Sequence, residues 1–277
     1  GTTRPAAAPD LTGLTGDVTR GEVVFHAAGC ASCHAAPRSE GEAKLILAGG
    51  QAFPSDFGTF YAPNISPDPE AGIGSWSASD LARAVQKGVS PRGKHYFPAF
   101  PYTAYALAEA QDIVDLHAYM ATLPADATPS QAHDVSFPFS IRRNLGGWKL
   151  LFGRPQWVLG GDGLSETVLR GRYLSEAMAH CGECHTPRNA LGGLDRSRWL
   201  AGAPDPSGKG RVPNITPAAL DWSEEDIAYY LESGFTPEFD SVGGHMASVV
   251  ENMAQLTPED RAAIAAYLKA VPPVANP

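Results

Sequence analysis

The sequence predicts an all-α protein of two tandem domains with long loops, and three observations support this prediction. The same phrases occur twice in the same order, with nearly equal gaps between them. Capping residues and apolar residues at helical spacing mark helices in both copies. Runs of alternating apolar and polar residues, which would indicate strands, are few. A repeat in which each copy has its own helices indicates two similar domains in succession.

The repeated phrases give the order of elements in each copy. The first copy reads CASCH, APNISP, WSASDLARAVQKGVSP and DIVDLHAYMATLP; the second reads CGECH, VPNITP, WSEEDIAYYLESGFTP and DRAAIAAYLKAVP. We therefore assign a disordered N-terminus to 1–14, a first domain to 15–130, an interdomain linker to 131–165 and a second domain to 166–277. The Ala-, Pro- and Thr-rich start is typical of a mature chain from which a signal or anchor has been removed.

Each copy is expected to begin with a helix that opens at Arg-Gly, at Arg20 and at Arg170, and leads to the first cysteine. A second helix should follow a hydroxyl at its cap with a carboxylate three residues later. These pairs are Ser77 with Asp80 and Ser223 with Asp226. Gly88 and Gly234 should end these helices. A last helix carries apolar residues at helical spacing, including Leu116 and Leu268.

Composition restricts the class of protein. Of 277 residues, 43% are hydrophobic and 18% are charged, which is typical of a globular chain with room for two cores. No run of about 18 apolar residues predicts a membrane span. The net charge of −9 argues against a nucleic-acid partner and is compatible with docking on a positive protein surface.

All the cysteines belong to two Cys-x-x-Cys-His motifs: Cys30, Cys33, Cys181 and Cys184. This spacing is that of c-type haem attachment, because two thiols on one helical turn reach the two vinyl groups of a haem. The histidine that follows then lies beneath the iron as its proximal ligand, here His34 and His185. Two such motifs predict two covalently bound haem c groups. Covalent attachment takes place outside the bacterial inner membrane, so we expect a periplasmic protein.

Two other uses of paired cysteines are less consistent with the sequence. A zinc ribbon would place its second pair about 15–20 residues after the first, whereas these pairs lie far apart. A redox dithiol of the thioredoxin kind would need a βαβ context, which the sequence lacks.

A sixth ligand is expected on the iron face opposite each histidine. For the second haem we expect Met246, in a loop after two glycines, with Met253 as the fallback and Met178 as a core residue. In the first copy, Phe100 stands where the repeat places Met246, since each lies twelve residues after the helix-ending glycine. Phenylalanine cannot bind iron.

The first haem therefore has several candidate states. His95, five residues before Phe100, is the nearest side chain able to bind iron; an open or water-bound iron and Met120 are the alternatives. The other histidines are expected to be surface or packing residues: His26, His117 and His133.

Further repeated residues are candidates for contacts with the haem propionates: Asn64, Asn214, Trp76 and Trp222. Amide and indole N–H groups can donate to carboxylates, although these residues can equally form a turn and a packed aromatic. Pro37 and Pro187, soon after the proximal histidines, are candidates to leave a carbonyl for the histidine Nδ1. The aromatic linker either packs between the domains or faces a partner or quinone.

Several phrases identify a resemblance to a known family. RGRYLSEAMAHCGECHTPRNALGG, PNISPDPEAGIGSWS and PFSIRRNLGGWKLLF resemble the cytochrome c subunit of membrane-bound alcohol and gluconate dehydrogenases, over nearly the whole chain from about Thr19. The resemblance implies tandem class I-like cytochrome c domains, each enclosing one covalent haem. It also implies transfer of electrons from a dehydrogenase towards a cytochrome, a quinone or an oxidase. The haem-linked cysteines and histidines and Met246 match the family's positions.

The sequence departs from that family in two places. The family usually has a third haem domain, whereas this chain ends after the second, and it often has YPAMPY where this chain has FPAFPY. We expect a periplasmic dihaem electron carrier that meets a membrane only through partners or a removed anchor. Its first haem would be His/His-like with a low potential, and its second His/Met with a higher one. The alternatives are a dihaem peroxidase or thiosulfate-type oxidoreductase acting at an open first haem, and haem storage.

Overall fold

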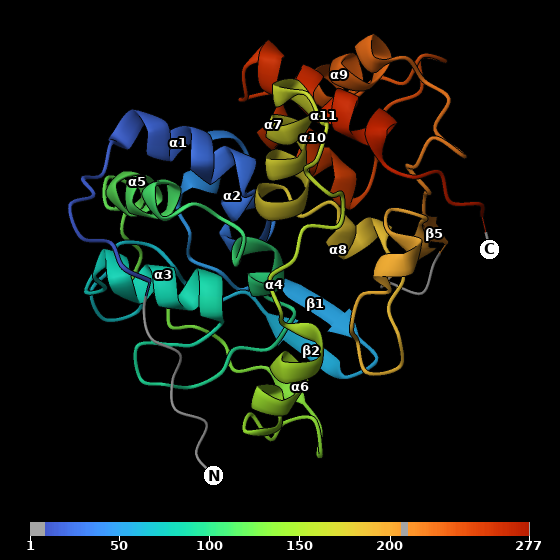
Figure 1. Ribbon diagram of the computed structural model, residues 1–277. Helices are drawn as coiled ribbons and strands as arrows, with labels where there is room; N and C mark the ends of the chain where they lie inside the picture. The colour runs from blue at the N-terminus through green and yellow to red at the C-terminus, as the bar shows by residue number, and fades with distance from the viewer. Residues whose placement is uncertain (1–8, 206–209, 277) are drawn as a thin grey trace. The chain divides into compact units, whose positions relative to one another are not determined.

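The computed structural model describes residues 9–205 and 210–276. The chain divides into two compact units, Gly1–Arg154 and Pro155–Pro277, and the division falls inside the segment expected to be a linker (Figure 1). Residues 1–8 of the expected disordered N-terminus lie outside the described residues. In the part that is described, Thr12 N donates to Asp10 Oδ1 at 3.0 Å and closes a turn.

The first unit contains helices and one small sheet. Its helical elements are α1 (Val18–Ala27), α2 (Cys30–His34), the 3₁₀ turn η1 (Gly41–Leu45), α3 (Ala78–Lys87), α4 (Tyr102–Tyr105), α5 (Ala110–Met120) and α6 (Asn144–Phe152). Its strands are β1 (Ala52–Ser55), β2 (Gly58–Tyr61) and β3 (Asp134–Val135), in the antiparallel order β1-β2-β3.

The second unit repeats this order of helices. Its helical elements are α7 (Glu166–Arg172), which continues into the π-helical turn η2 (Tyr173–Met178), α8 (Gly182–His185), η3 (Arg196–Arg198), α9 (Glu224–Ser233), α10 (His245–Met253) and α11 (Pro258–Ala270). Its strands are β4 (Ala203–Pro204) and β5 (Arg211–Val212), which pair antiparallel. Within the described ranges no helix combines the length and apolar character needed to cross a bilayer.

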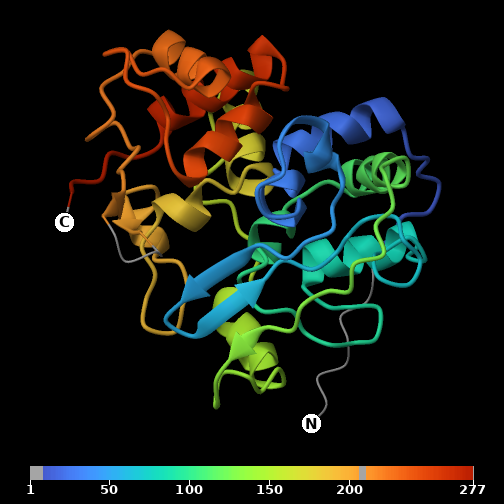
Figure 2. The ribbon, with the colours of Figure 1, turned by 180° about the vertical axis from the view of Figure 1, so that it is seen from behind.

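The fold is mainly α, and its short strands were not expected. The largest sheet is built on the β1–β2 hairpin, in which Ala52 pairs with Tyr61 and Ser55 with Gly58 (Figure 2). Gly58 has φ 123° and a Cβ there would meet the backbone of β3, so only glycine fits this strand. Four-residue strands are too short to produce a clear alternating pattern, which explains why the sequence did not reveal them.

The capped helices form as predicted. Both α3 and α9 begin with a reciprocal capping box. The serine side chain accepts from the backbone N–H of the aspartate three residues later, and the aspartate side chain accepts from the backbone N–H of the serine. The pairs are Ser77 with Asp80 and Ser223 with Asp226. Both helices end at a left-handed glycine, Gly88 with φ 59° and Gly234 with φ 76°.

The entry helices begin earlier than predicted. Helix α1 begins at Val18 behind the cap residue Asp17, and α7 begins at Glu166 behind the cap residue Ser165. The Arg-Gly pairs lie inside these helices, where each crosses the last helix of its copy of the repeat, α1 on α5 and α7 on α11 (Figure 1). The prediction that these helices open at Arg-Gly is therefore wrong: the Arg-Gly pairs mark the place where two helices pack together, not the place where a helix begins.

The glycine of each Arg-Gly pair lets the two helix backbones touch. A Cβ on Gly21 would overlap the carbonyl oxygen of Asp115, and a Cβ on Gly171 would overlap that of Ala263. Each would also lie 2.8 Å from the Cβ of a tyrosine on the last helix, Tyr119 or Tyr267. The crossing therefore tolerates no side chain, and it brings the first and last helices of each copy of the repeat into direct contact.

The spacing from the crossing glycine to the first cysteine is one residue longer in the second unit than in the first. Cys30 lies nine positions after Gly21, whereas Cys181 lies ten positions after Gly171. The additional residue is accommodated by the π-helical turn η2, whose wider i→i+5 bonding takes up one residue without changing either end.

Candidate haem sites

Each Cys-x-x-Cys-His motif folds as a short helix. Residues Cys30–His34 form α2, and Gly182–His185 form α8 directly after Cys181. None of the four cysteines, all of which lie among the described residues, forms a disulfide. Two thiols and a histidine on one helical turn are the arrangement that covalent haem attachment requires.

Both proximal histidines are oriented by a proline carbonyl. His34 Nδ1 lies 2.8 Å from Pro63 O, and His185 Nδ1 lies 2.8 Å from Pro213 O. Because the carbonyl can only accept, Nδ1 carries the proton and Nε2 is left as the iron ligand. The suggestion that Pro37 and Pro187 leave this carbonyl is therefore wrong: it comes from the prolines of the repeated PNI[ST]P phrase.

The electrostatic setting of these histidines favours the form that binds iron. Burial lowers the pKa of His34 and of His185, and the hydrogen bond to the proline carbonyl opposes this shift without cancelling it. The neutral imidazole is thus the stable form at neutral pH, as ligation of a metal requires.

A repeated glycine makes a second contact with each proximal histidine. We call the proline carbonyl and this glycine together the histidine cradle. Gly49 N donates to His34 O and Gly202 N donates to His185 O, both at 2.7 Å. Each glycine has a positive φ, and a Cβ on either would press on the backbone that carries Pro63 or Pro213. The sequence analysis did not predict a role for these glycines. The repeat does mark them, because each is the last residue of a Leu-Ala-Gly phrase that occurs in both copies.

The two alternative uses of the cysteines do not fit this geometry. Burial raises the pKa of Cys30 and of Cys181 to about 12, whereas a reactive dithiol needs a lowered thiol pKa. Across residues 9–205 and 210–276 there is no group of three His, Cys, Asp or Glu side chains able to hold a metal ion.

The repeated asparagines hold the end of each domain. Asn64 Nδ2 donates to the carbonyls of Asp126 and Thr128 at 2.8 and 2.9 Å. Asn214 Nδ2 donates to Val274 O at 2.7 Å. Their Oδ1 atoms accept from the backbone N–H two residues on, which makes an Asx turn. These partners favour the turn-forming role of the phrase over contact with a propionate.

The repeated tryptophans are half-buried beside the capped helices. Trp222 lies edge-on to Tyr230 with ring centroids 5.3 Å apart. The carbonyl of Trp76 lies 2.9 Å from His117 Nε2, so His117 is a packing histidine. His133 is another, because its Nδ1 accepts from Tyr61 N at 3.1 Å and its ring packs against Phe97. Propionate contact by the two indoles stays a prediction.

Met246 differs from the other methionines in its surroundings. It lies in the first turn of α10, so the expected loop is a helix here, whose cap residue Gly244 has φ 59°. Its side chain is half-buried, whereas the other three methionines are 2–5% exposed in the core: Met120, Met178 and Met253. Met246 is thus the one methionine with a side chain outside the packed core.

The structure supports the alignment that places Phe100 opposite Met246. After α3, Val89 forms an isolated antiparallel β-bridge with His95, and Tyr96 N donates to Gly88 O. After α9, Phe235 forms the same kind of bridge with Ser241, and Val242 N donates to Gly234 O. The same turn therefore leads to both positions. The ring of Phe100 packs with Tyr96 and Tyr105 at centroid distances of 5.8 and 5.9 Å.

His95 has a cation beside it. Lys149 Nζ lies 3.1 Å from His95 Nδ1 and donates to the carbonyls of Lys87 and Gly88, both at 2.7 Å. Burial lowers the pKa of Lys149 to about 8, so the ammonium form still predominates at neutral pH. An ammonium only donates, so Nδ1 of His95 accepts and Nε2 carries the proton. In this arrangement His95 has no free ring nitrogen for iron.

The second unit holds a buried polar network that the sequence did not indicate. Trp199 Nε1 donates to Tyr267 Oη at 2.8 Å, and Tyr267 Oη donates to Glu176 Oε1 at 2.7 Å. Glu176, in the π-helical turn, also accepts from Val158 N and Leu159 N at 2.6 and 3.0 Å. It is a buried carboxylate, 3% exposed, a few residues before Cys181.

The comparisons with known proteins agree with this geometry. The cytochrome c family matches residues 18–124 and again residues 168–272. A dihaem c-type cytochrome of Cereibacter sphaeroides is 59% identical over 98% of this chain and 92% of its own length. The fructose dehydrogenase cytochrome subunit of Gluconobacter japonicus is 39% identical over 92% of this chain. The cytochrome c subunit of the quinone-dependent alcohol dehydrogenase of Gluconobacter oxydans is 36% identical over 93% of this chain.

The extent of these matches differs. This chain spans nearly all of the dihaem relative but about half of the fructose and alcohol dehydrogenase subunits, 52% and 55% of their lengths. Two family matches coincide with two cysteine motifs and two histidine cradles. The chain therefore belongs to the cytochrome c family, with two tandem cytochrome c domains that each carry one covalently attached haem c.

Proposed function

We propose that this protein is a periplasmic electron carrier that accepts electrons from a dehydrogenase and delivers them to a cytochrome, quinone or oxidase. A haem c, when bound, supplies a one-electron couple whose potential depends on its axial ligands. The observation that carries the proposal is the duplicated cradle, in which His34 and His185 are each oriented with Nε2 free. The names of the relatives, which are cytochrome subunits of dehydrogenases, support a dehydrogenase as donor.

For the second haem we propose His185 and Met246 as the axial ligands. Support comes from the incomplete burial of Met246, since the other methionines are committed to the core. Thioether ligation raises the reduction potential relative to a second histidine. The second domain would then be the higher-potential end of the carrier.

For the first haem we propose a sixth position without methionine, because Phe100 occupies the equivalent place. The contact between Lys149 and His95 weighs against His95 and favours an open or water-bound iron. Histidine ligation would require Lys149 to withdraw or to lose its proton. Either state gives the first haem a lower potential than the second, so electrons would pass from domain 1 to domain 2.

The test is the near-infrared and EPR spectrum of the oxidised protein. We expect one sulfur-to-iron charge-transfer band, which Met246→Leu abolishes and the core substitution Met253→Leu leaves in place. His95→Ala should leave the EPR signal of the first haem unchanged if that iron is open or water-bound. Bands from two methionine-ligated haems, or two equal midpoints in a redox titration, would contradict the ordering of potentials.

A further inference from the structure

The segment before and through α6 exposes an unusual amount of apolar surface. Among the described residues, half of the large apolar side chains that are exposed lie in one stretch of fifteen residues in the first unit, 137–151. We call these five residues the linker patch: Phe137, Phe139, Ile141, Leu150 and Leu151. Phe137, Leu150 and Leu151 are 79%, 69% and 70% exposed. Exposed apolar side chains gathered in one segment indicate an interaction site more strongly than singly scattered ones do.

Two cations of the segment point inward and fix its orientation. Arg142 donates to His95 O at 2.9 Å and lies over the ring of Phe97 at 4.6 Å. Lys149 caps the carbonyl end of α3 and lies 4.4 Å from the ring centroid of Tyr102. Cations at a helix C-terminus are stabilised by its dipole. At Arg142 and Lys149 the usual arrangement is thus reversed, since these two charges face the unit while the apolar side chains of the linker patch are exposed.

The charge of the segment is opposite to that of the chain. Residues 135–154 contain four cations and no aspartate or glutamate, whereas the whole chain has a net charge of −9. Two of these cations, Arg143 and Arg154, are exposed near the linker patch in sequence. An acidic body with one basic and apolar segment would approach an anionic surface through that segment alone.

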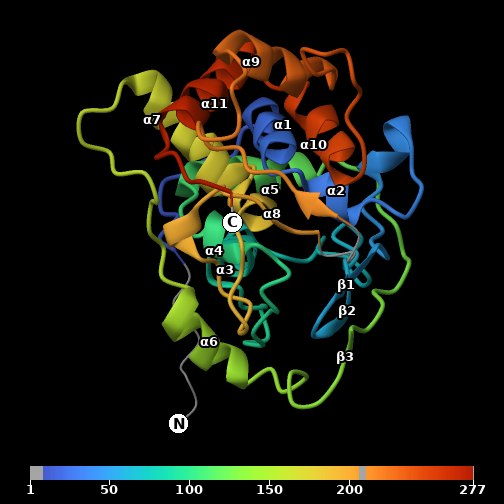
Figure 3. The same cartoon turned by 90° about the vertical axis from the view of Figure 1, so that its right-hand side faces the viewer.

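The place of the segment in the fold suits a soft surface. Figure 3 shows α6 and the loop before it at an edge of the first unit, away from α1 and α5. The patch residues come from a loop and one short helix rather than from the walls of a groove. A lipid interface accepts such protruding side chains without a matching shape, and basic residues add attraction to anionic headgroups.

We propose that the linker patch is a peripheral membrane-binding surface for bilayers with anionic headgroups. Phe137, Leu150 and Leu151 enter the interface, and Arg143 and Arg154 contact the phosphates. Binding of this kind is reversible and weakens as salt screens the charges. It would hold the carrier at the membrane surface without a spanning helix, and it does not depend on the ligands of either haem.

The experiment is flotation of the purified haem-loaded protein with vesicles. One set contains phosphatidylcholine alone and the other equal parts of phosphatidylcholine and phosphatidylglycerol, each at low and high salt. We expect binding to the anionic set at low salt, with about a tenfold loss of partition coefficient in the double variant Leu150→Ser/Leu151→Ser. Arg143→Gln should weaken the preference for the anionic set.

Matched controls separate the patch from general hydrophobicity. Leu191→Ser and Phe239→Ser remove side chains that are 59% and 88% exposed in the second unit, and they should bind as the parent does. Unchanged haem spectra and unfolding midpoints would show that the variants fold. Absence of parental binding, or equal binding by patch and control variants, overturns the proposal. So does loss of a dimer in the double variant, which would assign the patch to a second copy.

Discussion

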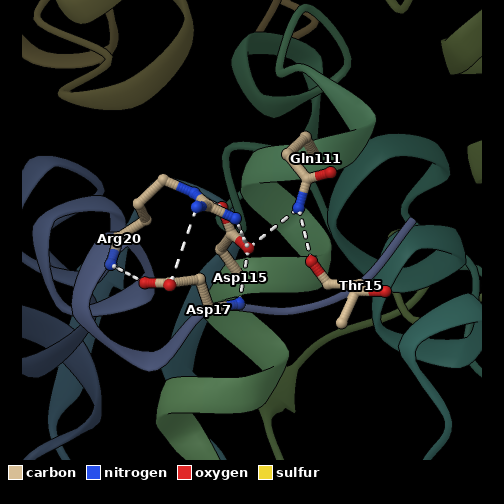
Figure 4. Close-up of polar contacts among 5 residues, drawn as sticks. All are labelled: Thr15, Asp17, Arg20, Gln111 and Asp115. Atoms are coloured by element: carbon tan, nitrogen blue, oxygen red, sulfur yellow. Dashed lines mark hydrogen bonds and ion pairs between the residues drawn. The ribbon is translucent and has the colours of Figure 1, made fainter.

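At the scale of single residues, Asp115 shows how one buried carboxylate can hold a domain together. Its side chain is 0% exposed and accepts from Asp17 N, from Arg20 and from Gln111, at 2.7–3.0 Å (Figure 4). Gln111 also donates to Thr15 O, which ties the segment before α1 to α5. Burial raises the pKa of Asp115, but these hydrogen bonds outweigh it and the pKa lies below its ordinary value.

Asp115→Asn should destabilise the first domain by about 2–3 kcal/mol, because an amide cannot accept all of these donors. A group with a lowered folded-state pKa contributes stability above its unfolded pKa and loses it as pH falls through the folded value. The acid limb of the stability curve, measured by denaturant unfolding from pH 7 downwards, should therefore be flatter in the variant.

The matched control is Asp56→Asn, at an exposed carboxylate in the turn between β1 and β2. It should change the free energy of unfolding by less than about 0.5 kcal/mol. If the two variants lose stability equally, the network around Asp115 does not have the role that we assign to it.

At the scale of elements, the repeat preserves the helix crossing and an ion pair beside it, but not the position of the aspartate in that pair. Arg170 Nε donates to Asp260 Oδ1 at 2.8 Å, as Arg20 Nε donates to Asp115 Oδ2 at 2.7 Å. Alignment of the tyrosines at the two crossings places Asp260 opposite Asp112, one helical turn before Asp115. The long arginine side chain reaches a partner at either turn, whereas the glycine contact permits no such shift.

Gly171→Ala should therefore destabilise the second domain by about 1–3 kcal/mol, because the added methyl group forces α7 and α11 apart. The control is Gly147→Ala in α6, where a Cβ would meet nothing within 4 Å. That substitution should be neutral or stabilise by up to about 1 kcal/mol, since alanine favours a helix. Thermal unfolding of both variants makes the comparison, and equal effects would contradict the close crossing.

The π-helical turn brings a buried charge near the second haem motif. Burial and the charge of Glu176 both raise the pKa of Tyr267, so its hydroxyl stays protonated and donates to the carboxylate. Glu176 also raises the pKa of Cys181, although burial is the larger cause. A fixed anion in this place should stabilise the oxidised haem.

Glu176→Gln should raise the potential of the second haem by tens of millivolts, on the order expected for one partly screened charge. Glu225→Gln, at an exposed position of α9, should leave both potentials unchanged. Redox titration of the two variants separates these outcomes. A shift confined to the first haem would contradict the placement of Glu176 beside the second.

At the scale of the whole molecule, the two similar domains differ at the proposed ligand position, where the first has Phe100 and the second has Met246. We expect Phe100→Met to create a second sulfur-to-iron band and to raise the lower midpoint of the redox titration. Tyr105→Phe, in the same aromatic cluster, is the control and should do neither. If Phe100→Met leaves the spectrum unchanged, the turn after α3 does not bring position 100 to the iron.

The sequence was informative wherever local chemistry decides structure. The capping boxes at Ser77 and Ser223 and the cysteine motifs require only neighbouring residues, and all of them were predicted. The carbonyls of Pro63 and Pro213 reach histidines 28 or 29 positions away, and this depends on loop paths that no local pattern specifies. The helix α10 was missed because its cap is a glycine without a side chain.

The crossing of the first and last helices has a consequence for how such a chain can arise. In each copy of the repeat, the contact at Gly21 or Gly171 brings the first helix against the last one, α5 or α11. A segment whose two ends meet in space can be copied head to tail without threading through its neighbour. Only a connection has to be added, and the duplicate can fold around its own haem. Tandem duplication of a one-haem ancestor is therefore a geometrically simple route to this dihaem chain.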